Sequence, residues 1–368
     1  MRGRRRHRRR HRRREAKPDF SADRALARLL LNACQSRPPL NCDALLALSA
    51  CSKIMHDVSK DDETDAIPLL TGSAAEFNIE PLLSCFGDYD IMYHRCNQLA
   101  IPAGTAPPTQ LPDEFDSRVE VCDIVDSEFP GYVYLMTSWL LTECADGEYE
   151  AFKCEREYLE YDDLEGYDSF HGPAMVTGWI NAPYCLLRLS GSRISIDQVY
   201  CMRCLLWPTT QAADWPTRQK NYGWPDTATI DHVVNNGCDL VRIPHPQCIR
   251  NQWHIQYRLS FSRAEVVLLN SWIPVQQIVY HMLRVFVKTE RLTENANNSD
   301  AATLSNYHIK TLMLWACELM PRSWWMHDLN LVRLCVELLH TLGDLLTVDI
   351  ILSTTVIYLL VMVTGVLL

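Results

Sequence analysis

The spacing of apolar residues changes along this chain, and the change limits the folds that the chain can adopt. Between residues 68 and 206 the apolar runs are short and are broken by Gly, Pro and Asp, as in strands and turns, with strand-like runs at 131–141 and 184–206. From residue 226 onward, apolar residues recur at helical spacing. The predicted helices cover residues 226–236, 262–270, 275–291, 304–319 and 331–346. The pattern therefore predicts an α+β fold in which a mixed sheet is followed by a helical part.

The chain is also too long for one hydrophobic core. Its 368 residues exceed the usual size of a single core, so two lobes are expected. The predicted parts are a disordered basic arm at 1–17, amphipathic helices at 18–60, a sheet lobe at 61–210, a helical lobe at 211–348 and a hydrophobic tail at 349–368.

Charge divides the chain into a short basic arm and an acidic body. The net charge is −10, but residues 1–17 carry +10 and the other 351 residues carry −20. An acidic body argues against a protein that grips nucleic acid along one basic face. The arm fits a nuclear address or a phosphate-binding segment, and a disordered terminus without a function is an equal alternative.

The location of the protein is predicted from its thiols and its two ends. Fifteen Cys residues, with no apolar segment behind the N-terminal charge run, predict reduced thiols in the cytoplasm or the nucleus. Residues 350–368 are uncharged and rich in Ile, Val and Leu, and at ~1.5 Å per residue they can just cross a bilayer core. They predict a membrane anchor that leaves both lobes in the cytosol. No basic residue flanks the run, and a buried terminal helix or a misassembled exon is the alternative.

A glycine turn and a pair of carboxylates provide the first chemistry. Gly72 and Ser73 lie where a strand meets a helix, and there a close backbone approach and free N–H groups suit a phosphate. Asp88 and Asp90 follow on a strand-like run, so both side chains point to one face and Ile91 points into the core. Two carboxylates about 7 Å apart at Cα can hold a divalent metal ion between them. Taken alone, such a pair more often marks a solvated turn.

A third carboxylate completes the pattern. Asp197 lies on another alternating run, about a hundred residues later, and a two-metal site needs such a group to neutralise two cations and to activate a hydroxyl. A Gly-Ser turn, a carboxylate pair and then a single carboxylate on a neighbouring strand resemble the layout of nucleotidyltransferases with the polymerase-β-like fold.

Two longer motifs point to one family. Residues 258–265 read RLSFSRAE and residues 304–318 read LSNYHIKTLMLWACE. Both resemble signatures of the family that unites cyclic GMP-AMP synthase, its animal receptor relatives and the male-abnormal (Mab-twenty-one) developmental proteins. The resemblance covers about residues 60–345. It implies a bilobal polymerase-β-like nucleotidyltransferase fold, with the mixed sheet lobe followed by a C-terminal helical lobe.

The resemblance also implies roles for individual residues. Gly72 and Ser73 would cradle phosphate, and Asp88, Asp90 and Asp197 would be the catalytic metal ligands for two Mg²⁺ or Mn²⁺ ions. The nucleotide-binding residues would be Arg258 at a base, Tyr307 stacked on a base, and Ser260 and Glu265 in support. A guanidinium suits purine edges and an aromatic face suits any base. Without the resemblance, Arg258 would be interpreted as an ion-pair partner and Tyr307 as a core residue.

The implied activity is the joining of ATP and GTP into a cyclic or linear dinucleotide in innate immune signalling. The alternative is a non-catalytic Mab-type protein that serves as an interaction scaffold in development. Three carboxylates converging on one cleft favour catalysis, because a scaffold has no need for such repulsion. The base choice, the linkage and the oligomeric state are left open.

Three departures from the synthase limit the resemblance. The zinc-binding insertion after the Ser-Phe-Ser motif is absent, so no zinc is expected and DNA sensing of that kind is in doubt. Cys201 and Cys204 lack a second ligand pair and would face opposite sides of a strand. The phosphate-binding Lys of the synthase has no secure counterpart, and Tyr280, Arg284 or Lys288 could replace it. An RNA or DNA activator receives little support from an acidic body.

Overall fold

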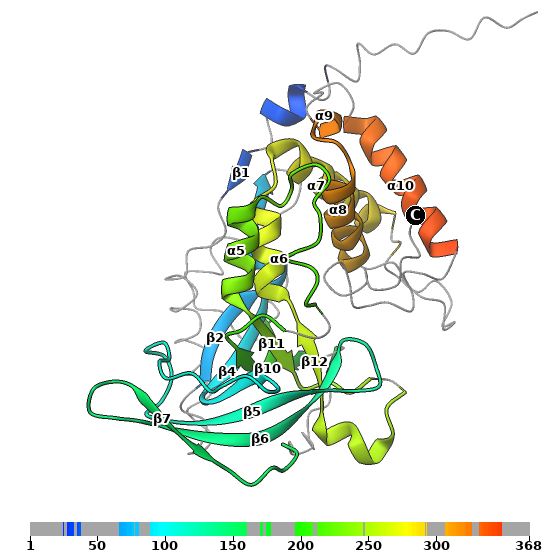
Figure 1. Ribbon diagram of the computed structural model, residues 1–368. Coiled ribbons are helices and arrows are strands. Elements are labelled where there is room, and N and C mark those ends of the chain that lie inside the picture. Colours follow the sequence, from blue (N-terminus) through cyan, green and yellow to red (C-terminus); the bar gives the residue numbers. More distant parts are fainter. Residues whose placement is uncertain are drawn as a thin grey trace, which may run out of the picture.

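The structure is a computed structural model of the 368-residue chain. The residues that it describes are 25, 28–32, 35–37, 66–76, 78–80, 89–159, 170–171, 174–177, 196–208, 212–245, 247–290, 292, 306–325 and 331–347. Long strands gather at one end of the molecule and most helices at the other (Figure 1).

The strands alternate with loops through the first two thirds of the chain. They are β1 (Gln35–Arg37), β2 (Ala66–Thr71), β3 (Asn78–Glu80), β4 (Tyr89–Pro102), β5 (Arg118–Asp126), β6 (Tyr132–Glu143), β7 (Tyr149–Lys153), β8 (Phe170–His171), β9 (Ala174–Thr177), β10 (Ile196–Cys204), β11 (Cys238–Val241) and β12 (Gln256–Ser260). The predicted strand at 131–141 is thus confirmed as β6. The predicted run at 184–206 is confirmed in its last part as β10, and residues 184–195 lie outside the described ones.

Ten strands form one mixed sheet, as predicted. The order is β2-β4-β5-β6-β12-β11-β10-β9-β8, and β7 pairs with β6. The pairs β4–β5 and β4–β10 are parallel, while the other pairs are antiparallel. Strand β4 is long enough to pair with β2 through its first half, with β5 through its last residues, and with β10 in both parts. A short separate pair joins β1 to β3.

The described helices include the five that apolar spacing predicts, with nearly the expected bounds. They are α3 (Gly72–Ala75), α5 (Thr227–Asn236), α6 (Ser262–Asn270), α7 (Pro274–Thr289), α8 (Asn306–Leu319), α9 (Arg322–Trp325) and α10 (Leu331–Thr347), with a 3₁₀ turn η1 at Arg250–Ile255. The Asp226 side chain accepts a hydrogen bond from the Thr229 N–H at 2.8 Å and caps α5. Gly237 ends that helix at φ 60°, a conformation that glycine adopts freely.

Two strands lie within the stretch that the sequence predicts as helical. Strands β11 and β12 fall between residues 211 and 348, yet they pair with each other, with β10 and with β6. The sheet therefore continues well past residue 210. Their short length, four and five residues, makes them hard to distinguish from helix by periodicity.

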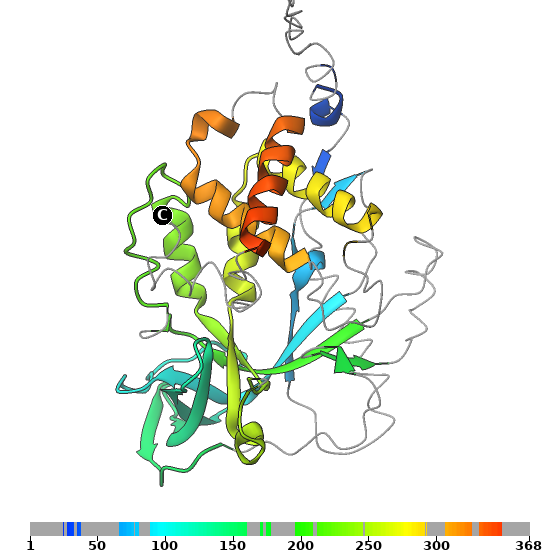
Figure 2. The same cartoon turned by 90° about the vertical axis from the view of Figure 1, so that its right-hand side faces the viewer.

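One large core joins the sheet to the helices. Val133, Leu240 and Leu259 from three strands pack in the same buried cluster as Leu268 of α6 and Leu314 of α8. A second, smaller core lies under β5, β6 and β7, the strands that extend away from the helices in Figure 2. Helix α6 contacts β11 and β2 of the sheet, and α8 belongs to the same buried cluster.

The two ends of the chain fall largely outside the described residues. The basic arm at 1–17 and the tail at 349–368 lie outside the described residues, and of the stretch 18–60 only short pieces are described, with 28–32 helical. Within the described part of the chain, no helix has the length and apolar character needed to cross a membrane.

Candidate active site

The turn at Gly72 touches the carboxylate of Asp90. Strand β2 ends at Thr71, α3 begins at Gly72, and Gly72 has φ +62°. A Cβ at this position would collide with the carboxylate oxygen Oδ2 of Asp90. The backbone also links the two, because the Thr71 hydroxyl donates a hydrogen bond to the Asp90 carbonyl at 3.2 Å. Only glycine combines this backbone conformation with so close an approach.

Strand register brings Asp197 to the same point. Asp90 of β4 pairs with Asp197 of β10 in the parallel ladder, and with Thr71 of β2 in the antiparallel one. Neighbouring strands lie about 4.8 Å apart, so the backbones of Gly72, Asp90 and Asp197 meet in one small region. Asp88 and the side chains of Ser73 and Asp197 lie outside the described residues. Ile91 is 4% exposed, in agreement with the predicted alternation.

Of the predicted metal ligands, only Asp90 has a side chain that the structure describes. Carboxylate oxygens are the ligands that Mg²⁺ and Mn²⁺ prefer, and the missing side chain of Gly72 leaves the Asp90 carboxylate directly against the turn. In the described part of the chain, no group of three or more His, Cys, Asp or Glu side chains is arranged to hold a metal ion. The third predicted ligand, Asp88, is outside that part.

A buried ionic network lies next to the turn. Glu76 is the residue that directly follows α3, and its Oε1 is 2.6 Å from the ammonium group of Lys310 on α8. The same ammonium group is 3.0 Å from Oε2 of Glu265 on α6, one of the predicted nucleotide-binding residues. The Tyr280 hydroxyl of α7 donates to Oε2 of Glu76 at 3.2 Å. We name the set Glu76, Glu265, Tyr280, Tyr307 and Lys310 the Lys310 network.

The pKa of Tyr307 is shifted by its burial, by charges of this network and by that of Arg258. Burial raises the pKa of Tyr307 well above its ordinary value, and the charge of Glu265 and a hydrogen bond to it raise it further. The positive charges of Lys310 and Arg258 act in the opposite direction. Arg258 is half-buried on β12, opposite Val241 of β11. The structure therefore places Glu265 against Lys310, and Tyr307 within reach of the charges of Glu265, Lys310 and Arg258.

Sequence reasoning missed Lys310 and Glu76. Lys310 lies between the buried residues Ile309 and Leu312, so a charge on the apolar face of a predicted helix was the available signal. Glu76 follows directly on the predicted turn. Of the three proposed replacements for the synthase Lys, Tyr280 binds Glu76, the Arg284 guanidinium lies 5.3 Å from the centre of the Tyr280 ring, and Lys288 is exposed.

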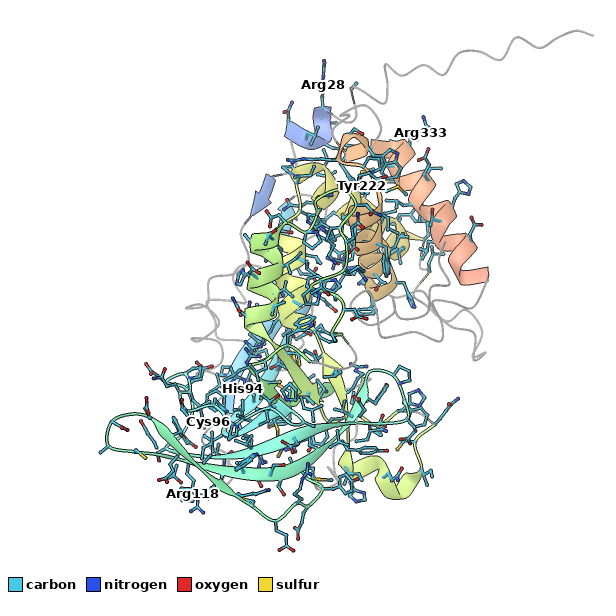
Figure 3. The ribbon with its side chains drawn as sticks, viewed as in Figure 1. Arg28, His94, Cys96, Arg118, Tyr222 and Arg333 are labelled. Carbon is cyan, nitrogen blue, oxygen red and sulfur yellow. The ribbon has the colours of Figure 1, made fainter. Side chains whose placement is uncertain are left out.

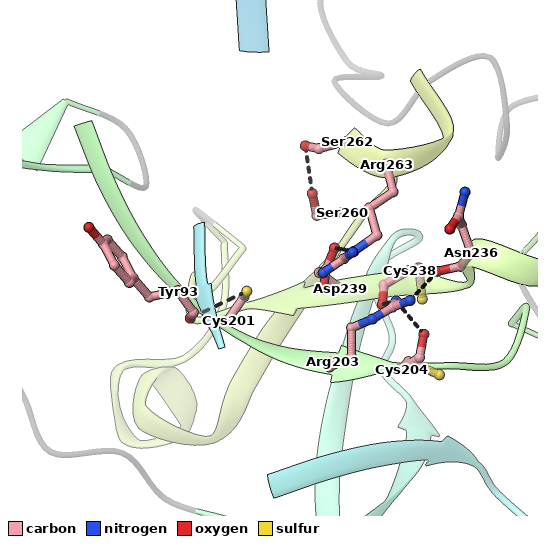
Figure 4. Close-up of polar contacts among 10 residues, drawn as sticks. All are labelled: Tyr93, Cys201, Arg203, Cys204, Asn236, Cys238, Asp239, Ser260, Ser262 and Arg263. Carbon is pink, nitrogen blue, oxygen red and sulfur yellow. Dashed lines mark hydrogen bonds and ion pairs between the residues drawn. The ribbon is translucent and has the colours of Figure 1, made fainter. Parts of the chain in front are cut away.

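A second polar cluster braces the strands beside the site (Figure 4). The Arg203 guanidinium donates to the carbonyls of Cys204 and Cys238, at 2.8 and 3.0 Å. Arg263 of α6 donates through Nε to the buried Asp239 carboxylate at 2.9 Å. Ser260 and Ser262 face each other with hydroxyl oxygens 3.0 Å apart. These contacts fix β10 and β11 against the start of α6, and they place Ser260 at that junction.

The two thiols of the Cys201–Cys204 run make separate contacts. Cys201 donates to the carbonyl of Tyr93 at 3.5 Å, and Cys204 donates to the carbonyl of Leu206 at 3.2 Å. Cys204 also lies opposite Cys238 in the β10–β11 ladder. The run therefore serves the packing of two different strand pairs.

One comparison with known proteins identifies the central segment. Residues 141–271 match the family model described as the Mab-21 protein nucleotidyltransferase domain. This segment belongs to the Mab-21 family. The sequence-based recognition is confirmed, and a nucleotidyltransferase-like function is supported. Asp197, Arg258, Ser260 and Glu265 lie inside the Mab-21 match, whereas the Gly72 turn and Lys310 lie on either side of it.

Proposed function

We propose that this protein is a metal-dependent nucleotidyltransferase that joins ATP and GTP into a cyclic or linear dinucleotide, as cyclic GMP-AMP synthase-like receptors do in innate immune signalling. The observation that carries the proposal is the meeting of Gly72, Asp90 and Asp197 where β2, β4 and β10 pair. A glycine that leaves a carboxylate uncovered beside a helix start suits a phosphate with its metal ion. The proposal includes the bilobal polymerase-β-like fold, with the helices closing over the nucleotide.

Each residue has a part in the proposed reaction. Asp88, Asp90 and Asp197 would hold Mg²⁺ or Mn²⁺, which neutralises phosphate charge and lowers the pKa of the attacking hydroxyl. The Gly72 turn and Ser73 would bind the terminal phosphates through backbone N–H groups. Asp197 would accept the proton of a 3′- or 2′-hydroxyl, the oxygen of that hydroxyl would bond to the α-phosphorus, and the bond from the α-phosphorus to pyrophosphate would break. Arg258 and Tyr307 would hold a base, with Ser260 and Glu265 in support.

The scaffold alternative is favoured by one observation. Glu265 is already bound by Lys310, and its hydrogen bond with Tyr307 contributes to the raised pKa of that residue. Two of the candidate nucleotide-binding residues thus have internal partners that suit a purely structural role. A non-catalytic Mab-type protein would keep this packing and would use its surface to bind other proteins.

A turnover assay tests the proposal against the scaffold. Purified protein is mixed with ATP, GTP and Mg²⁺ or Mn²⁺, with and without RNA or DNA, and products are separated after phosphatase treatment. We expect a phosphatase-resistant dinucleotide. The double variant Asp90→Asn with Asp197→Asn should lose activity by a factor on the order of 100 or more. Asp113→Asn, an exposed loop acid, is the matched control and should keep it.

Two results would reject the proposal that this protein is an enzyme. One is a wild-type protein that makes no product under any of these conditions. The other is product that survives the double substitution, because the two carboxylates would then not serve the reaction. Circular dichroism of the variants checks that a loss of product does not reflect a loss of fold.

The location of the protein and its attachment to a membrane are also proposals. We propose a cytoplasmic protein whose residues 350–368 attach it to a membrane, with nuclear entry through the basic arm as the alternative. Deleting 350–368 should turn a carbonate-resistant membrane protein into a soluble one. A full-length protein that is already soluble would reject the anchor.

A further inference from the structure

The cradle, defined as residues Gly72–Ala75 of α3, is too short to hold its own shape. A helix of four residues gains too few internal hydrogen bonds to offset the cost of starting it. The N-cap residue Thr71 makes no side-chain hydrogen bond to the helix. The cradle must therefore be held by contacts outside itself.

Those contacts lie at its two ends. At the first end, Thr71 is fixed by its pairing with Asp90 and by its hydroxyl bond to the Asp90 carbonyl. At the second end, Glu76 is 2% exposed, and both of its carboxylate oxygens have partners. Lys310 of α8 binds one oxygen and Tyr280 of α7 binds the other. Among the described residues, side chains of the helical part thus bind both carboxylate oxygens at the second end.

Lys310 is the charge on which this arrangement depends. Two carboxylates, that of the buried Glu76 and that of the partly buried Glu265, lie within 3.0 Å of its ammonium group. Burial opposes the charge on Lys310, but the two carboxylates raise its pKa well above the ordinary value. The ammonium group is therefore retained throughout the neutral range. Without it, Glu76 and Glu265 would repel each other and would have to take up protons or move toward water.

We propose that Lys310 is a positioning residue that holds the cradle through Glu76 and so couples helices α6, α7 and α8 to the phosphate-binding turn. The proposal deepens the function proposed above and rests on it for the catalytic consequence. The mechanical consequence, a cradle whose order depends on Lys310, does not need nucleotide. A purely structural ion pair would stabilise the whole molecule without a particular effect on residues 72–76.

Hydrogen exchange of the backbone amides distinguishes these two roles. The experiment compares Lys310→Met, Lys310→Arg and the wild type on peptides that cover residues 70–77, with peptides from β10–β11 as an internal reference. The matched control is Glu318→Gln, which removes another buried ionic partner from the same helix, where Glu318 binds Arg218 at 2.7 Å.

We expect a local effect in Lys310→Met only. Exchange at 72–76 should rise at least tenfold more than in β10–β11, whereas Lys310→Arg should stay within about threefold of the wild type. Glu318→Gln should leave 72–76 unchanged relative to the reference peptides. Equal changes in Lys310→Met and Glu318→Gln, or no change at 72–76, would overturn the proposal.

A milder pair of variants covers the case in which Lys310→Met does not fold. Tyr280→Phe and Glu76→Gln each remove part of the contact with Glu76, and each should raise exchange at 72–76 selectively by several-fold. If neither does, the proposal is wrong.

The kinetic readout separates this proposal from the proposed function. In an active enzyme, Lys310→Met should raise KM for nucleotide more than it lowers kcat, and Lys310→Arg should restore most of the loss. A wild type without activity rejects the proposed function alone, because hydrogen exchange still decides whether Lys310 holds the cradle. If the enzyme is active but hydrogen exchange at residues 72–76 does not change in the Lys310 variants, the positioning role alone is rejected.

Discussion

The two halves of α8 carry buried ionic clusters of opposite charge balance. In the first half, Lys310 is shared by the carboxylates of Glu76 and Glu265. In the second half, the carboxylate of Glu318 is shared by Arg218 at 2.7 Å and Lys220 at 3.7 Å. One cluster has an excess of acid and the other an excess of base, although both lie on one helix within the same core.

The difference shows what each cluster is connected to. The Lys310 network reaches the cradle through Glu76, so an acidic excess lies beside the region where Asp90 and Asp197 meet. The Glu318 cluster instead holds the segment 212–225 against α8. The Lys220 ammonium group lies 4.7 Å from the centre of the Trp215 ring, and the Arg218 guanidinium lies 5.1 Å from the centre of the Trp315 ring. The first cluster adjoins the candidate active site, and the second fastens a loop.

Burial also has opposite outcomes for the two lysines. The carboxylates around Lys310 raise its pKa, whereas burial lowers the pKa of Lys220 to about 8 in spite of Glu318. Two acids thus outweigh desolvation, while one acid shared with Arg218 does not. The first lysine cannot give up its charge near neutral pH, and the second can.

The largest effect on stability should come from Lys310→Met. Removing the ammonium group leaves the buried carboxylate of Glu76 and the partly buried one of Glu265 without their cation, and breaking a buried pair costs about 3–5 kcal/mol of the free energy of unfolding. Urea denaturation at pH 7 measures it. A loss below about 1 kcal/mol would mean that Glu76 and Glu265 reach water readily, and the contrast between the clusters would disappear.

The next effect is the pH dependence of Lys220. Its pKa is about 8 in the folded protein and 10.5 in the unfolded chain. Between these values the unfolded chain holds more protons, so stability should rise with pH relative to Lys220→Met, by at most about 3 kcal/mol. Urea denaturation from pH 7 to 10.5 tests this. If the free energies of unfolding of the wild type and of Lys220→Met change with pH in parallel across this range, Lys220 is not desolvated.

Glu318→Gln should cost less than Lys310→Met, about 2 kcal/mol. The two cations that remain are better able to adapt, because Lys220 can release its proton and the Arg218 side chain is 16% exposed. The same denaturation series gives the comparison. A larger loss than in Lys310→Met would reverse the proposed ranking of the clusters.

The smallest effect belongs to a surface pair on α10. Arg333 lies 2.6 Å from Glu337, one helical turn away, but its side chain is 67% exposed and points outward in Figure 3. Arg333→Met should change stability by about 0.5 kcal/mol or less. A loss comparable to that of Glu318→Gln would show that burial is not what distinguishes the clusters.

Apolar spacing and local motifs predicted the helices and strands of the molecule better than they predicted the contacts between them. The spacing predicted α8 within two residues, and the Gly72 turn was expected at a strand-to-helix junction because Gly-Ser follows an apolar run. Asp197 was expected on a strand next to that of Asp90, and β10 does pair with β4. Register itself, which places these two residues opposite each other, depends on the whole sheet.

The contacts that were missed join residues far apart in the chain. Glu76 and Lys310 are separated by more than two hundred positions, and no spacing rule connects an acid after a turn with a lysine inside a helix. Strands β11 and β12 were missed because each is short and lies between helices, so only pairing with β6 and β10 gives them strand character. Tertiary contacts, and not the local sequence pattern, determine the secondary structure of such segments.

The central claim is that the region around Gly72, Asp90 and Asp197 accepts a nucleotide together with a divalent metal ion. Calorimetric titration with a non-hydrolysable ATP analogue tests it most directly. The wild type should bind the analogue in the presence of Mg²⁺ or Mn²⁺ and at least tenfold more weakly with a chelator, and Asp90→Asn should bind at least tenfold more weakly than the wild type in either metal. No binding by the wild type, or binding that is unaffected by the metal and by Asp90→Asn, would contradict the account.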